Sequence, residues 1–169
     1  MKIDEAIRTA IEYELKVRDV YQDAAGRAAD PVGKRVFALL GQEEQNHVAY
    51  LEARLADWRK SGRLRLEAIA SRVPPMERIR EAAASIEARL AGPGAAREVE
   101  LLERARQVEI ETSDYYQRMV DALEADEREF FARFLEIEHG HLAIVDAELT
   151  AVKGLGYWFD MPEFDLEAG

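Results

Sequence analysis

Six glutamate and histidine residues interrupt the apolar stripes of this chain, and they limit its fold more than any other feature. Four long segments repeat apolar residues at steps of three and four, the spacing that aligns side chains along one face of a helix. Polar residues occupy that stripe where a helical bundle would place leucine or isoleucine. They are Glu14, Glu44, His47, Glu109, Glu138 and His141.

The four segments predict four long helices. Asp30 and Pro31 are typical of a helix cap followed by a first-turn proline, and Ser61-Gly62 indicates the end of that helix. The stretch that follows, about residues 61–94, contains a short amphipathic segment at about 76–90 and ends at the breaker Gly92-Pro93-Gly94. We expect the long helices at about residues 3–29, 31–60, 95–123 and 126–153.

Two helical hairpins joined by one long crossover indicate an all-α, ferritin-like four-helix bundle, because a simple up-and-down bundle needs only short loops. We expect one bundle domain over residues 1–153, with the crossover and its short helix inside it. The tail, residues 154–169, is aromatic and acidic without helical period. Its aromatic side chains Trp158, Phe159 and Phe164 are expected to pack against the bundle or a neighbouring subunit.

The polar stripe residues predict a pair of metal ions. Burying four unpaired carboxylates would oppose folding by several kcal/mol each, whereas two divalent cations would neutralise them. The chain has no cysteine, so any metal must use oxygen and nitrogen ligands. The alternative is a pair of ion-paired hairpins whose carboxylates face solvent.

An internal repeat favours the metal site over that alternative. A shift of 95 residues superposes Glu14 on Glu109 and Tyr21 on Tyr116. A shift of 94 residues superposes the two Glu-x-x-His units, whose paired side chains share one helical face. Each tyrosine lies two turns beyond a glutamate of the stripe and is expected to hydrogen-bond a ligand carboxylate, with an ordinary core position as the alternative.

The arrangement resembles the rubrerythrin branch of the ferritin-like superfamily over about residues 3–153. That resemblance implies a di-iron site in which all six stripe residues are ligands, redox chemistry with peroxide, dioxygen or ferrous iron, and a homodimer. Two departures matter. Peroxide-reducing rubrerythrins carry an extra glutamate where this chain has Thr112, and they append a four-cysteine electron-donating domain that a cysteine-free chain lacks.

The resulting functional expectation is a di-iron oxidoreductase that reduces hydrogen peroxide or dioxygen. Electrons would come from Fe(II) or from a separate donor whose identity stays open. Two alternatives remain: an iron-binding or ferroxidase protein that handles or stores iron, and a catalase-like protein with two manganese ions. Zinc also accepts oxygen and imidazole ligands.

Charge and hydropathy set the remaining expectations. The net charge of -11 opposes binding to nucleic acid or to an anionic membrane. The sequence has no signal-peptide pattern and no apolar run of membrane-spanning length, so a cytoplasmic protein is expected. Three glutamates close to the stripe are expected to be solvated, with a supplementary metal contact as the alternative: Glu43, Glu111 and Glu136. His139 is expected to be a surface histidine and not a ligand.

Overall fold

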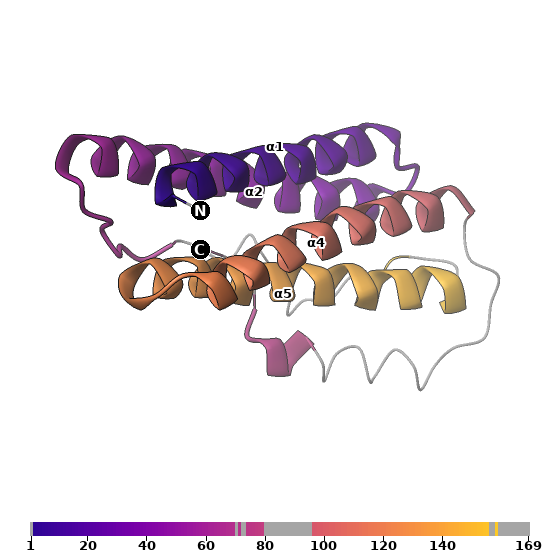
Figure 1. Ribbon diagram of the computed structural model, residues 1–169. Helices are drawn as coiled ribbons and strands as arrows, with labels where there is room; N and C mark the ends of the chain where they lie inside the picture. Colours follow the sequence, from indigo (N-terminus) through magenta and orange to yellow (C-terminus); the bar gives the residue numbers. More distant parts are fainter. Residues whose placement is uncertain (1, 70, 72–73, 80–95, 156–157, 159–169) are drawn as a thin grey trace.

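The computed structural model describes residues 2–69, 71, 74–79, 96–155 and 158. Within these residues the chain forms helices and no strand. The long helices are α1 (Ile3–Arg27), α2 (Pro31–Ser61), α4 (Ala96–Ala122) and α5 (Ala125–Leu155). α1 pairs with α2 and α4 pairs with α5, and α1 also packs against α4 (Figure 1). The fold is the predicted all-α, ferritin-like helical bundle.

Local chemistry sets the ends of α2 as the sequence predicts. The side chain of Asp30 accepts a hydrogen bond from the backbone N–H of Val32 at 2.7 Å and caps the helix, with Pro31 as its first residue. Gly62 closes the helix with a φ of 65°, a left-handed conformation that glycine adopts without steric cost. α5 runs to Leu155, slightly beyond its expected end. Residues 76–79 are helical, and the rest of the expected short helix lies outside the described residues.

The start of the crossover is fixed to both hairpins through Glu67. Its backbone carbonyl accepts hydrogen bonds from the Tyr50 hydroxyl of α2 at 2.8 Å and from the Arg133 guanidinium of α5 at 3.3 Å. Its carboxylate pairs with Arg54 of α2 at 2.7 Å. The first part of the crossover, at Glu67, therefore lies against both Glu-x-x-His helices.

The apolar core is divided into two clusters, and the six stripe residues lie between them. On α1, Ala10 belongs to one cluster and Val17 to the other, with Glu14 between them. On α2, Leu40 and Leu51 flank the Glu-x-x-His unit in the same way. Each end of the bundle is thus closed by packed apolar side chains. None of the described helices has the length and hydropathy needed to cross a lipid bilayer.

The tail reaches the core through Trp158, which is buried as predicted. Its indole N–H donates to the Glu98 carboxylate of α4 at 2.9 Å, and its ring meets the edge of Phe37 at a centroid distance of 5.1 Å. The ring lies against Gly33, where a Cβ would approach it to 2.3 Å. Only glycine therefore fits at this position of α2. Phe159 and Phe164 lie outside the described residues.

Candidate metal centre

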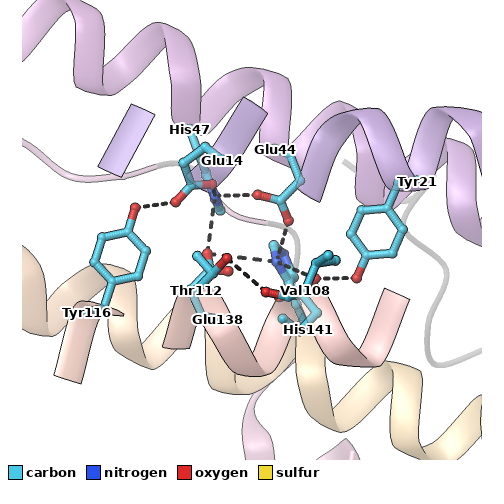
Figure 2. Close-up of polar contacts among 10 residues, drawn as sticks. Glu14, Tyr21, Glu44, His47, Val108, Thr112, Tyr116, Glu138 and His141 are labelled. Atoms are coloured by element: carbon cyan, nitrogen blue, oxygen red, sulfur yellow. Dashed lines mark hydrogen bonds and ion pairs between the residues drawn. The ribbon is translucent and has the colours of Figure 1, made fainter. Parts of the chain in front are cut away.

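Four helices bring the six stripe residues together at the centre of the bundle (Figure 2). Each helix contributes from its buried face: one glutamate from α1, one from α4, and a Glu-x-x-His unit from each of α2 and α5. All six side chains have no exposed surface. This excludes the alternative in which the carboxylates face solvent.

The ligand-type atoms fall into two groups of four, each compact enough to surround one cation. The first group is Glu14, Glu44, His47 and Glu138, and the second is Glu44, Glu109, Glu138 and His141, with all contributing atoms within 4.8 Å of one another. Glu44 and Glu138 belong to both groups. The geometry therefore provides two neighbouring cation positions with two shared carboxylates, and each position has one carboxylate and one imidazole of its own.

The two histidines present the same nitrogen to the carboxylates. The Nδ1 atom of His47 lies 3.2 Å from Glu14 Oε2 and from Glu44 Oε2, and 3.4 Å from Glu138 Oε1. The Nδ1 atom of His141 lies 2.8 Å from Glu44 Oε1. The contact between His141 Nδ1 and Glu44 Oε1 is close but lacks hydrogen-bond geometry, so both atoms are buried without a hydrogen-bond partner. Close but misaligned atoms of this kind are expected of ligands that share a cation.

The metal fits because the centre holds more buried polar atoms than the protein can satisfy. Both carboxylate oxygens of Glu44 and of Glu138 are buried without a hydrogen-bond partner, as is Oε2 of Glu109. Buried polar groups in folded proteins are normally paired, and each unpaired one costs about 1–3 kcal/mol or more when charged. Oxygen and imidazole donors suit iron, manganese and zinc alike. Two divalent cations would satisfy the oxygens and balance the four carboxylates.

Two of the carboxyl groups resist ionisation in the metal-free protein. Burial raises the pKa of Glu44 well above its ordinary value, and repulsion by the Glu138 and Glu14 carboxylates raises it further. Burial likewise raises the pKa of Glu109, with repulsion from Glu138 and Glu44 in addition. Both groups are therefore held in the neutral form more strongly than exposed glutamates.

The two histidines respond oppositely to the same surroundings. Burial by itself lowers the pKa of His47, but attraction to the Glu14 carboxylate and hydrogen bonds that the ring donates to neighbouring glutamates outweigh burial and raise that pKa well above the ordinary value. Burial also opposes the ionisation of Glu14, yet attraction to His47 leaves the pKa of Glu14 lowered. Burial lowers the pKa of His141. In the metal-free protein His47 and Glu14 thus form an ion pair, whereas His141 stays neutral.

These pKa shifts make the metal-free fold sensitive to pH. Glu44, Glu109 and His47 have raised pKa values, so each stabilises the fold below its unfolded pKa and loses that contribution as pH rises through its folded pKa. Glu14 and His141 have lowered pKa values and are deprotonated in both states above about pH 6.5, so they add no slope there. The metal-free protein therefore loses stability as pH rises above about 6.5.

Two buried tyrosines link the single glutamates across the hairpins. The hydroxyl of Tyr21 on α1 donates to Glu109 Oε1 on α4, and the hydroxyl of Tyr116 on α4 donates to Glu14 Oε1 on α1. Figure 2 shows them approaching the cluster from opposite ends. Burial, with the adjacent carboxylate charge, raises both phenol pKa values well above normal, so the phenols remain donors. Each tyrosine thus hydrogen-bonds a carboxylate of the candidate centre that the other hairpin contributes.

Among the flanking residues, the expectation for Glu43 was wrong. Its side chain is only 5% exposed and lies within 4.8 Å of a ring nitrogen of His47 and of His141. Glu43 precedes His47 by four residues, so the two share a helical face. That spacing is a signal for the contact with His47, but it does not show that the face is buried or that His141 lies near it. Glu136 and His139 are exposed, as expected.

Glu111 and Thr112 do not join the cluster. Glu111 is partly exposed and pairs with Lys16 across α1 and α4. Thr112 is buried, and its hydroxyl donates to the backbone carbonyl of Val108 at 2.9 Å. The hydroxyl of Thr112 is therefore satisfied within α4 and does not bond to the carboxylates of the centre.

Comparison with known proteins agrees with this geometry. The rubrerythrin family model matches residues 5–149, which is most of the chain. No match was found among curated proteins or among solved structures. The family implies a di-iron protein of the ferritin-like superfamily, and the buried carboxylate and histidine groups are of the kind that bind such metals. On the length of this match and the fold, the chain belongs to the rubrerythrin family.

Proposed function

We propose that this protein is a non-haem di-iron oxidoreductase that reduces hydrogen peroxide or dioxygen with electrons from Fe(II) or from an external donor. The observation that carries the proposal is the pair of fully buried four-residue groups that share Glu44 and Glu138. Two cations bound by these groups would be neighbours and could act together on one small oxidant. A single-metal or purely structural site would not need shared carboxylates.

Each residue of the proposed di-iron centre has a distinct role. Glu14 and His47 would hold one iron, Glu109 and His141 the other, and the two shared glutamates would join them. When bound there, two Fe(II) ions would supply the two electrons that reduction of one peroxide to water requires. Tyr21 and Tyr116 orient the end carboxylates through their hydroxyl groups.

The surroundings of the centre limit what reaches it. The two apolar clusters close the bundle above and below the ligands and keep bulk water from them. A small neutral molecule such as hydrogen peroxide or dioxygen can cross packed protein more readily than a large or charged substrate. This restriction supports a small oxidant as the substrate class.

The test begins with protein purified under argon and loaded with Fe(II). Metal content is measured by elemental analysis, and the loaded protein is then mixed in a stopped-flow instrument with peroxide and, separately, with air-saturated buffer. About two irons per chain and oxidation that stops at that stoichiometry would support the oxidoreductase. Continued uptake of iron far beyond two per chain would instead support a ferroxidase or storage role.

Histidine variants supply matched controls for this test. His141→Ala removes a ligand-type residue and should abolish both di-iron absorbance and turnover. His139→Ala removes an exposed histidine only two residues away and should leave both unchanged. Turnover that survives in His141→Ala would contradict the assignment of the centre, and so would failure of the unaltered protein to bind metal.

A further inference from the structure

Glu43 is a buried carboxylate that the two four-residue groups do not use. It lies on α2, one residue before Glu44, and forms a separate group with His47 and His141 in which the contributing atoms lie within 4.8 Å of one another. All three side chains are buried. The rings of His47 and His141 stack with a centroid distance of 5.5 Å and an angle of 16° between their planes. One carboxylate therefore lies beside a pair of nearly parallel imidazoles.

The Nε2 atoms of His47 and His141 are the ring nitrogens left to form hydrogen bonds with Glu43. Both Nδ1 atoms face the carboxylates of the proposed centre, at distances between 2.8 and 3.4 Å for the nearest oxygens. The Nε2 atoms of His47 and His141 are buried and have no hydrogen-bond partner. An imidazole that binds a cation through Nδ1 carries its proton on Nε2, and that N–H needs an acceptor.

The internal repeat gives α5 no carboxylate that corresponds to Glu43. The 94-residue shift that superposes the two Glu-x-x-His units places Glu43 opposite Ile137 on α5. His141 thus has no carboxylate of its own at the corresponding position, although its ring nitrogen is within reach of Glu43. A carboxylate has two oxygens and can accept one hydrogen bond on each.

We propose that Glu43 accepts the Nε2–H groups of both His47 and His141 and thereby fixes the tautomer that presents both Nδ1 lone pairs to the two cations. This inference rests on the metal-binding function proposed above. Glu43 is a positioning residue: it acts on the metals only through the two imidazoles. The contributing atoms lie within 4.8 Å of one another, so hydrogen bonds of about 3 Å form once the Glu43 side chain shifts toward the two rings.

A positioning role predicts opposite effects on folding and on metal binding. Glu43→Leu replaces a buried carboxyl group by an apolar side chain of similar volume, so the metal-free protein should keep or gain thermal stability. Its affinity for metal should fall by about 10–100-fold, the usual effect of losing an acceptor behind a histidine ligand. A residue that served only to stabilise the fold would lower stability and affinity together.

The experiment uses zinc, a diamagnetic probe, and protein labelled with ¹⁵N at histidine. Zinc stoichiometry and affinity are measured by competition with a chelator, and long-range ¹H–¹⁵N spectra report which ring nitrogen carries the proton. The unaltered protein should bind two zinc ions and show slowly exchanging Nε2–H signals from both rings. In Glu43→Leu these protons should exchange faster, and Glu43→Gln, with one acceptor oxygen, should be intermediate. Glu52→Leu, an exposed change on the same helix, is the control.

Three results would overturn the inference. Unchanged affinity and unchanged Nε2–H signals in Glu43→Leu would exclude Glu43 as the acceptor and leave the metal centre itself intact. A third zinc ion in the unaltered protein, with the Nε2 protons missing, would make Glu43 a ligand and not a positioning residue. No zinc binding by the unaltered protein would overturn both this inference and the proposed function.

Discussion

Replacing Glu44 with leucine should stabilise the metal-free protein and abolish the pair of cation positions. Glu44 belongs to both four-residue groups, is fully buried, and has two oxygens without hydrogen-bond partners. Burial raises the pKa of Glu44, so the fold opposes its ionisation unless a cation is bound beside it. Exchange of buried ionic groups for apolar ones of similar volume typically stabilises a protein by about 1–4 kcal/mol.

The size of this effect can be measured directly. A gain of about 1–4 kcal/mol corresponds to a rise in Tm of roughly 2–16 °C for a chain of this length. Urea denaturation in the presence of a chelator should therefore show a higher midpoint for Glu44→Leu than for the unaltered protein. With Co(II) present the order should reverse, because cation at 100 times its Kd stabilises the unaltered protein by about 2.7 kcal/mol for each site.

Glu52→Leu is the matched control, because it makes the same substitution on an exposed face of α2 and should change stability by no more than about 0.5 kcal/mol. The reasoning would be refuted if Glu44→Leu lowered the metal-free stability by more than about 1 kcal/mol and still bound two Co(II) ions. That outcome would mean that Glu44 is held by structural hydrogen bonds and is not a ligand.

Four further predictions follow from particular contacts. The Tm of the metal-free protein should fall between pH 6.5 and 9 as the buried acids and His47 lose their protons, and a rising Tm would contradict the assigned pKa directions. Gly33→Ala should displace the ring of Trp158, seen as a red shift of tryptophan fluorescence, whereas an unshifted spectrum would exclude the close approach. Tyr21→Phe should weaken metal binding by at least about tenfold in a chelator competition, and equal affinity would show that its hydrogen bond does not orient a ligand. Ala125→Gly should stabilise the protein by about 0.5–1 kcal/mol in urea denaturation, because Ala125 has a φ of 48°, and destabilisation would argue against strain there.

The helices could be predicted because their signals are local. The stripe spacing fixed four helices to within about two residues at each end, and Asp30 and Gly62 marked the ends of α2 through capping and left-handed backbone geometry. The short crossover helix had a weaker signal, and only residues 76–79 of it fall in the described part of the chain. Local periodicity therefore defines the long helices well, and the rest of the short crossover helix stays a prediction.

The six residues of the candidate centre could also be predicted, because a carboxylate in an apolar stripe is unfavourable without a partner. The repeat of Glu-x-x-His in two helices distinguished this pattern from a chance occurrence. The prediction was wrong for Glu43, which was expected in solvent because its position is rotated out of the stripe. Burial of Glu43 depends on how closely α2 and α5 approach, and no pattern within one helix contains that distance.

The sequence by itself determined which helices form, which of their faces are buried, and which six polar residues interrupt those faces. Tertiary structure decided how these residues pair: that Tyr21 reaches Glu109 and Tyr116 reaches Glu14 across the hairpins, and that one carboxylate, Glu43, lies beside both histidines. The physical reason is the distance along the chain over which each interaction acts. Helix formation and the choice of the buried face depend on residues three or four apart. These contacts depend on the relative rotation and spacing of the helices, which only the packed core sets.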